Sequence, residues 1–116
     1  MALVVTPDGA LFRHEFTDDL DHLRALIGGG YLQAVPSQTT EDWLLCDEDG
    51  QSKELPLNPK AIHLCDQRGF EFRGPLRGQV AFVMQRRITT RYEDGYEEED
   101  AQFISADPDL LAHADH

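Results

Sequence analysis

Two cysteines and five histidines are the side chains that could bind a transition metal. Cys46 lies 19 residues before Cys65, and His63 is separated from Cys65 by a single residue. Zinc sites usually pair their ligands as Cys-x-x-Cys or as two histidines with three to five residues between them, and neither spacing occurs here. If residues 59–66 are helical, His63 and Cys65 point roughly 200° apart and cannot share an ion. The sequence therefore predicts no metal site and no cofactor.

Two acidic turns, 47–50 and 93–95, have the composition of calcium-binding loops but not their spacing. When the glycine of either turn is placed at the sixth position of an EF-hand, the twelfth position is Pro56 or Ala101 instead of Glu. No serine lies in a Gly-x-Ser-x-Gly turn, and the glycine run 28–30 has no Gly-Lys-Ser/Thr after it. We therefore expect a protein that is not an enzyme.

Gly29, Gly30 and Tyr31 form one candidate binding segment, and Asn58 with Pro59 forms another. Glycines supply positive φ angles, and Asn followed by Pro is typical of a helix start, so both segments have a structural explanation. The alternative is that the glycine loop and the helix N-terminus at Asn58 converge on an anion-binding pocket, with Tyr31 as a stacking wall. Such a pocket would suit a nucleotide. The sequence leaves both interpretations open.

The strongest compositional feature is negative charge: 22 acids and 10 bases give a net charge of −12. Residues 93–116 contain nine acids and no Lys or Arg, and they are densest at Glu97, Glu98, Glu99 and Asp100. Such a segment repels nucleic acid and anionic membranes and attracts a partner protein with a basic surface. A solvated tail is the simpler interpretation. An acidic mimic of nucleic acid is a further one, although the remaining residues carry a net charge of only −3.

Arg86, Arg87 and Arg91 form the basic cluster that lies immediately before the acidic run. Recognition of nucleic acid needs a basic face with interleaved aromatic side chains, and three arginines beside an acidic run do not supply one. We expect these arginines to pair with the acidic run, and we expect no direct binding of nucleic acid.

Alternation and turn residues predict the elements of an α+β fold with a small, mostly antiparallel sheet and two short helices. We expect residues 52–55 to form a strand that pairs back across the turn at 47–50. We expect another turn at Gly74-Pro75. The remaining expected elements are a hairpin over 3–16 with its turn at 7–9, a helix over 18–27 capped by Thr17 or Asp18, strands over 31–35 and 42–47, a helix over 59–66 and a central strand over 79–85.

Charge and apolar periodicity both change near residue 92, which predicts a single domain over 1–92 and an acidic, partly ordered or flexible C-terminal segment over 93–116. A chain that ends at Tyr92 is accordingly expected to fold. Phe103 and Ile104 are apolar enough to dock on the domain, and a helical turn can start at Asp107.

Three segments follow one another in a recognisable order: Gly-Gly-Tyr-Leu-Gln-Ala-Val-Pro at 29–36, Leu-Leu-Cys-Asp-Glu-Asp-Gly at 44–50 and Leu-Pro-Leu-Asn-Pro at 55–59. In these segments the chain resembles a family of small uncharacterised domains of bacteriophages and bacterial mobile elements. The resemblance covers roughly residues 2–84 and implies a context rather than a mechanism. No membrane-length apolar run and no signal peptide is visible, so we expect a cytoplasmic protein, in the host cytoplasm if the chain is phage-encoded.

The first hypothesis is therefore a non-enzymatic phage-type protein that binds and modulates a host protein with a basic surface, countering host defence. A nucleotide-sequestering protein and an acidic mimic of nucleic acid are the alternatives.

Overall fold

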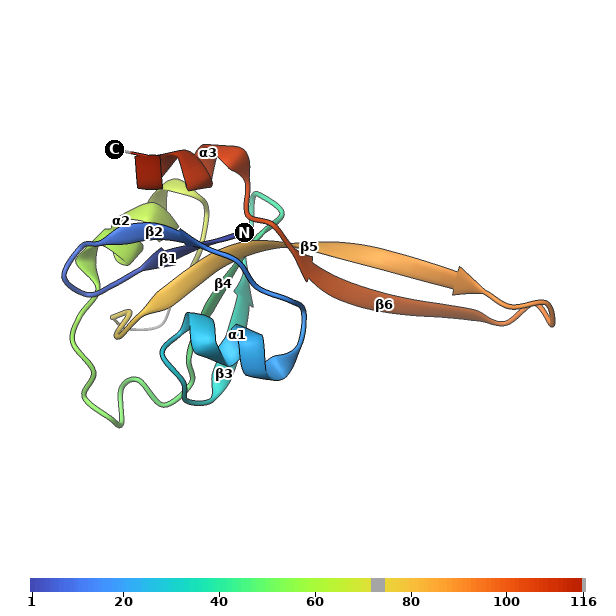
Figure 1. Cartoon of the computed structure of the whole chain (residues 1–116), viewed down its shortest axis with the longest axis horizontal. Coiled ribbons are helices and arrows are strands. Elements are labelled where there is room, and N and C mark those ends of the chain that lie inside the picture. Colours follow the sequence, from blue (N-terminus) through green and yellow to red (C-terminus); the bar gives the residue numbers. More distant parts are fainter. Residues whose placement is uncertain (72–74, 116) are drawn as a thin grey trace.

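The apolar run predicted over 79–85 becomes the central strand of a six-stranded sheet in the computed structural model, which describes residues 1–71 and 75–115. The sheet order is β2-β1-β5-β4-β3, and β6 pairs with the outer part of β5 (Figure 1). Every named strand pair is antiparallel. The elements are β1 (Ala2–Val5), β2 (Leu11–His14), α1 (Leu20–Leu26), β3 (Leu32–Pro36), β4 (Asp42–Asp47), α2 (Pro59–Gln67), β5 (Val80–Arg91), β6 (Glu97–Ile104), α3 (Pro108–Leu111) and the 3₁₀ turn η1 (Ala112–Asp115).

The inner half of β5 is buried on both faces because helices cover both faces of the sheet. Side chains alternate along a strand. Val80 and Phe82 therefore join the cluster under α2 and α3, whereas Ala81 and Val83 join the cluster under α1. This arrangement explains why the sequence here is continuously apolar instead of alternating.

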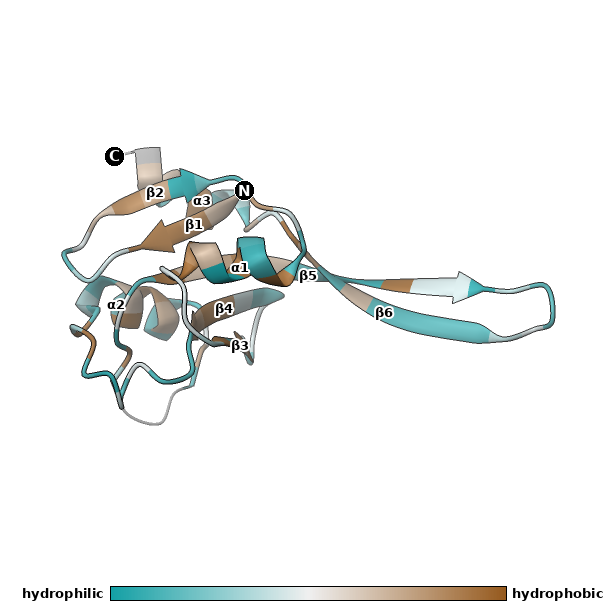
Figure 2. Cartoon of the chain, turned by 60° about the horizontal axis from the view of Figure 1, so that its bottom comes forward, coloured by the Kyte–Doolittle hydropathy of each residue, from teal (hydrophilic) through white to brown (hydrophobic). Residues whose placement is uncertain are grey.

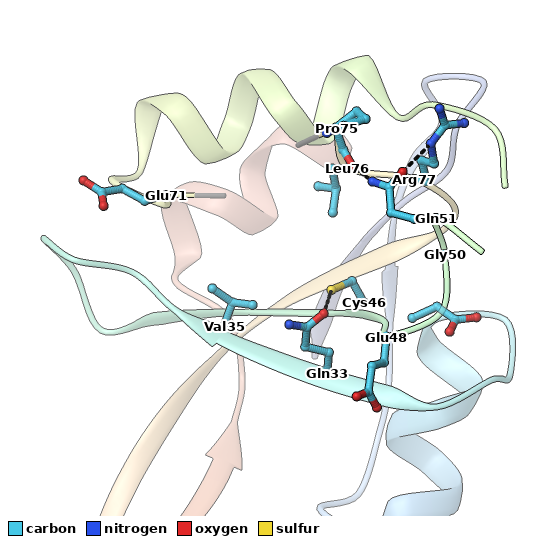
Figure 3. Close-up of a pocket in the computed structure, with 11 residues that line it drawn as sticks. Gln33, Val35, Cys46, Glu48, Gly50, Gln51, Glu71, Pro75, Leu76 and Arg77 are labelled. Carbon is cyan, nitrogen blue, oxygen red and sulfur yellow. Dashed lines mark hydrogen bonds between the residues drawn. The ribbon is translucent and has the colours of Figure 1, made fainter. Parts of the chain in front are cut away.

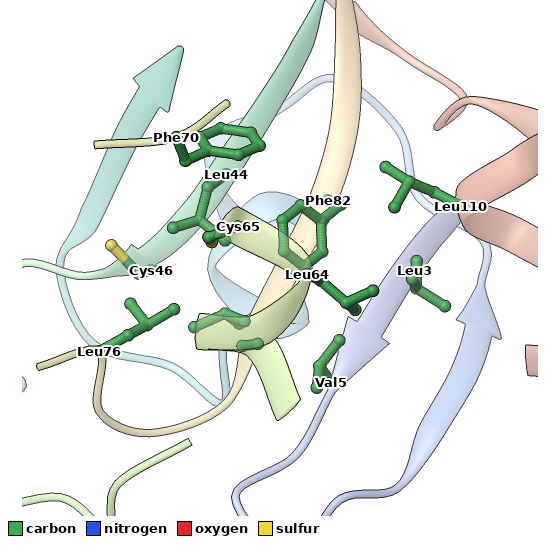
Figure 4. Packing of buried hydrophobic residues seen from close by; sticks show 12 residues of the cluster. Leu3, Val5, Leu44, Cys46, Leu64, Cys65, Phe70, Leu76, Phe82 and Leu110 are labelled. Atoms are coloured by element: carbon green, nitrogen blue, oxygen red, sulfur yellow. The ribbon is translucent and has the colours of Figure 1, made fainter. Parts of the chain in front are cut away.

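Helix α2 covers one face of the sheet through Leu64 and Cys65, and Leu110 of α3 lies beside it (Figure 4). The rings of Phe70 and Phe82 meet edge to face, with centroids 5.7 Å apart. Edge-to-face packing is a favourable geometry for buried aromatic rings. The C-terminal helix therefore completes the same core as the central helix.

The other face is covered by α1, whose buried side chains are Leu23 and Leu26. The predicted helix is confirmed, but its N-cap is Asp19 rather than Thr17 or Asp18. The carboxylate of Asp19 accepts a hydrogen bond from the backbone N–H of His22 at 2.9 Å. A cap needs a side-chain acceptor three residues before the N–H that it satisfies, and Asp19 is the acid that meets this geometry.

The first hairpin, the strand over 42–47 and the helix after Asn58 are also confirmed. The pairing expected for 52–55 is wrong: residues 48–54 form successive turns, and the bridge of this region joins Leu57 to Arg77. The expected turn at Gly74-Pro75 lies partly outside the described residues.

The acidic C-terminal tail is not confirmed, because most of residues 93–116 belong to regular elements. Glu97–Ile104 form β6, which pairs with β5 as a long hairpin that leaves the body of the molecule (Figures 1 and 2). Ala106 and Leu110 are buried, and α3 begins with Asp107 as its N-cap, as the sequence predicted. The boundary expected after residue 92 is thereby corrected: the chain leaves the body, turns and returns to complete the core.

Candidate functional site

The glycine loop that ends α1 has a structural explanation at each position. Gly28, Gly29 and Gly30 all have positive φ angles, which side chains rarely adopt. A Cβ atom on Gly30 would also collide with the carboxylate of Asp47. Tyr31 is 64% exposed, and its ring lies 5.8 Å from the guanidinium of Arg24. The loop thus presents one exposed aromatic ring.

Asn58 is fully buried, and the hydrogen bonds of its side chain are all made within the fold. Its amide nitrogen donates to the carbonyls of Val5 at 3.0 Å and Gly78 at 2.8 Å. Its carbonyl oxygen accepts from the N–H of Ala61 at 3.1 Å, as the N-cap of α2. Asn58 therefore ties α2 to β1 and to the segment before β5, and offers no group to a ligand.

The structure does not bring Tyr31 and Asn58 together. The glycine loop follows α1, which packs on one face of the sheet, and Asn58 starts α2, which packs on the other. The sheet separates the two segments, so they do not form the shared pocket that the nucleotide hypothesis requires.

The predicted acidic residues all lie in β6, but they do not form one patch. Successive side chains of a strand point to opposite faces. Glu97 and Glu99 therefore share one face of the hairpin, and Glu98 and Asp100 share the other. All four are exposed.

The hairpin of β5 and β6 forms an arm, which we define as residues 85–103. It gives the molecule a longest extent of 52 Å against 32 and 25 Å in the other directions. Figure 2 shows the arm as a largely hydrophilic two-stranded ribbon, whereas the strands of the body carry the strongly hydrophobic stretches. Side chains from Arg86 to Ala101 are exposed on both faces. An isolated two-stranded ribbon is marginally stable in water, and its edges carry backbone N–H and C=O groups that can pair with another strand.

A defined turn closes the arm at its tip. Tyr92 donates its N–H to the carbonyl of Tyr96 at 2.8 Å, and Gly95 donates to the carbonyl of Tyr92 at 3.0 Å. Gly95 has φ +86°, the left-handed conformation of the glycine in a three-residue hairpin loop. The two tyrosine rings lie 5.7 Å apart and are 48% and 61% exposed. The tip therefore presents two aromatic rings to solvent.

Weak polar side-chain contacts add to the backbone pairing that joins the two strands of the arm. Arg91 and Glu97 form an exposed ion pair at 2.9 Å, and the Tyr92 hydroxyl donates to Glu98 at 2.9 Å. The guanidinium of Arg86 donates to Gln102 at 2.9 Å. Exposed pairs of this kind contribute at most about 1 kcal/mol each. The expected pairing of arginines with the acidic run is confirmed for Arg91.

The base of the arm is anchored more firmly. The ring of Phe103 meets Trp43 edge to face, with centroids 5.8 Å apart. The N-terminal amino group of Met1 donates to the Ser105 hydroxyl at 3.0 Å, and Ala106 donates its N–H to the Met1 carbonyl at 2.8 Å. These contacts fix the direction in which the arm leaves the body.

A groove of about 300 Å³ lies between β3, β4 and the segments that flank α2 (Figure 3). Its polar groups largely bind one another: Arg77 donates to Gln51 at 3.0 Å, and Cys46 donates to Gln33 with Sγ and Oε1 3.8 Å apart. Burial and the charge of Asp47 raise the pKa of the Cys46 thiol to about 11, so the thiol is protonated at neutral pH and is a poor nucleophile. The described residues that line the groove include no activated nucleophile, and nothing in the sequence pattern had indicated the groove.

Within residues 1–71 and 75–115, no three His, Cys, Asp or Glu side chains gather closely enough to hold a metal ion. No helix among these residues is long and apolar enough to cross a membrane.

Sequence reasoning missed the arm, although a signal was present. Asp94-Gly95 is a common hairpin turn, and Ile88, Thr89 and Thr90 before it favour a strand. The acids after the turn have low strand propensity and suggested a tail.

Comparison with known proteins gives a family but no activity. No curated protein and no solved structure matches the chain. A family model, described as a domain of unknown function (DUF3846), matches residues 1–105, a range that includes the whole arm. The chain therefore belongs to the DUF3846 family.

Proposed function

We propose that this chain is a non-enzymatic interaction protein, of the phage type that its signature residues resemble. Its arm binds a host protein with a basic surface and modulates that protein, countering host defence. The observation that carries the proposal is the arm itself, which leaves the body with both faces exposed and belongs to the residues matched by the family model.

The charge of the arm supports a basic partner. The three arginines of the arm, Arg86, Arg87 and Arg91, are outnumbered by the six acids of the turn and β6, and of the three only Arg91 lies directly opposite an acid, Glu97. The outer strand of the ribbon is the acidic one, so a partner that approaches β6 meets carboxylates on both faces. Carboxylates on an exposed strand attract a cationic surface over about 8 Å at physiological salt.

The test is capture of a partner from host lysate by three forms of the full chain. In the first, Glu97, Glu98 and Glu99 become Gln and Asp100 becomes Asn; Asp94 is kept because its carboxylate holds the N–H of Tyr96 in the turn at 2.9 Å. The matched control neutralises four exposed acids of the body, Glu15, Asp18, Glu48 and Asp66. The third form is the wild type.

We expect the arm variant to lose most of its capture at low salt, and the body control to keep it. The difference should shrink at high salt, because screened charges contribute little. Equal capture by the two variants would show that the acids of the arm are not the binding surface. Binding of nucleic acid by the arm variant alone would show instead that the acids serve to neutralise the arginines.

A further inference from the structure

One long edge of the arm has no neighbouring strand. Met84 is the last residue of β5 that is paired on both sides, with Asp42 of β4 and with Ile104 of β6. From Gln85 to Arg91, β5 is paired with β6 alone in the described part of the chain. The edge that continues the line of β4 is therefore open along the whole arm.

The backbone of β5 offers regular hydrogen-bonding groups at this open edge. Tyr92 donates its N–H to Tyr96 across the hairpin, so its backbone faces the returning strand. The N–H and C=O groups of successive residues in a strand point alternately to either side. Those of Arg87, Thr89 and Arg91 consequently face the open edge, as a further strand would require.

We propose that the open edge of β5 pairs with the same edge of a second copy of this chain. The two strands run antiparallel and are centred on Ile88, so that two arms form one four-stranded sheet. In this register Arg87 lies opposite Thr89 of the second copy, Arg86 opposite Thr90, Gln85 opposite Arg91, and Ile88 opposite Ile88.

The positions of the arginines select this register. A shift of the register by two residues, which moves the centre to Arg87 or Thr89, places Arg87 opposite Arg87 or Arg91 of the second copy, and like charges directly opposite are destabilising. A shift by one residue brings Arg87 opposite Ile88 or Thr90, whose backbone groups point away from the open edge. The register centred on Ile88 keeps the arginines apart over the full length of the edge.

The same register gives acids to two arginines that lack them within one chain. Arg86 lies opposite Gln102 and Arg87 opposite Ala101, and no ion pair of either is present among the described residues. In the paired arms, Arg86 lies opposite Thr90 of the second copy, and that threonine lies opposite Glu98 of its own chain. Arg86 and this Glu98 are therefore in one line across the sheet, separated only by the short threonine side chain. Glu99 of the second copy lies in the same way beyond the threonine that faces Arg87. Charge complementarity therefore runs across the two arms.

The outer edge of β6 cannot pair with itself in this way. In an antiparallel self-pairing centred on its four consecutive acids, 97–100, carboxylates would lie directly opposite carboxylates, and charged residues on an edge strand disfavour such pairing. Ile88 supports the use of the β5 edge, because it is an apolar side chain 38% exposed in the middle of a polar arm. The second copy would cover it. This leaves the β6 edges outermost, available to a different partner.

The test is the mass of the full chain in sedimentation equilibrium, for the wild type and two variants at Thr89. T89P removes an N–H that faces the open edge, a position at which strands tolerate proline. T89R places an arginine opposite Arg87 of the second copy, while within its own chain it faces Glu99 and should strengthen the arm.

We expect a dimeric wild type, a monomeric T89P with an unchanged circular dichroism spectrum, and a T89R whose dimer dissociates about tenfold more readily because of the opposed arginines. A wild type that is monomeric at every concentration overturns the proposal, as does a T89R that dimerises as tightly as the wild type. If T89P does not fold, T89R decides alone. A monomer that still captures the host protein overturns only this dimer, and a dimer that captures nothing overturns only the proposed function.

Discussion

Individual residues were most predictable where the signal is local. Asn58-Pro59 indicates a helix start in the sequence, and it is one in the structure. The hydrogen-bond acceptors of the Asn58 amide could not be predicted from the sequence, because they are the carbonyls of Val5 and Gly78, 53 and 20 residues away. Without these long-range contacts, a buried side chain that makes three hydrogen bonds within the fold cannot be distinguished from a side chain that binds a ligand.

Replacement of Asn58 by Ala should lower the free energy of unfolding by about 2–4 kcal/mol, because it removes the N-cap and leaves two buried carbonyls without a donor. Urea unfolding measures the loss. N58D provides a comparison: it keeps the capping acceptor but directs a carboxylate at the same carbonyls, so it should also be destabilised. A stable N58A would return Asn58 to the list of candidate binding residues.

The cap of α1 predicts a dependence of stability on pH. Hydrogen bonds from the Thr17 hydroxyl and from the backbone N–H and ring of His22 lower the pKa of Asp19 from its ordinary 3.8 to about 2. Since the pKa is lower in the folded state, the stabilisation is present above 3.8 and is lost as the pH falls through 2.

In the variant D19N, the amide oxygen can still accept from the N–H of His22 but does not titrate over this range. The difference in urea midpoint between wild type and D19N should therefore change between neutral pH and about pH 2. The wild type and D19N share all their other carboxylates, so the contribution of these groups to the pH dependence cancels in the difference. A difference that is the same at both pH values would mean that Asp19 is not held by these bonds.

At the scale of elements, helices and inner strands were predictable, and the arm was not. The helices are specified by caps and apolar spacing within about ten residues of sequence. β6 is a strand only because Thr89, Thr90 and Arg91 of β5 lie beside it, and its acids on their own favour disorder. Because the acids are consecutive in the sequence, they were expected to form one surface. In a strand, successive side chains point to opposite faces, so the acids are divided between the two faces of the arm.

The turn at the tip should decide whether the arm forms. Gly95 has φ +86°, and nothing lies within 4 Å of a Cβ atom built on it, so a substitution there is costly for conformational reasons alone. G95A should weaken the arm by about 1 kcal/mol, whereas G95N should be milder because Asn tolerates this conformation better. Amide hydrogen exchange along β6 measures the effect. Equal protection in G95A and wild type would contradict the proposed turn.

At the scale of the whole molecule, the C-terminal helix belongs to one of the two buried clusters of the body, the cluster under α2. The change of charge near residue 92 predicted a boundary there. The charge changes because the side chains of the arm are exposed, and it gives no information about the packing of the residues that follow the arm. Phe103, Ala106 and Leu110 return to the body, and the last two are buried. The docking expected for Phe103 is confirmed by its contact with Trp43.

Two deletions separate the arm from the core. A chain that ends at Tyr92 loses Leu110, whose burial alone is worth about 1.5–3 kcal/mol, and should be unfolded or strongly destabilised. A chain in which residues 87–101 are replaced by a short Asn-Gly turn keeps every buried residue of the C-terminal segment and should fold. Circular dichroism with urea titration compares the two. A stable chain ending at Tyr92 would restore the boundary that the sequence suggested.

The central claim is that the arm, and not the glycine loop, contacts the partner, and two tyrosines of nearly equal exposure allow a direct test. Tyr96 at the tip of the arm is 61% exposed and Tyr31 is 64% exposed. Each is replaced in turn by a photo-crosslinking phenylalanine derivative in the full chain, which is then irradiated in host cells. We predict adducts with a protein other than this chain from position 96 and none from position 31. Adducts from position 31 alone would contradict the claim and place the binding surface on the body.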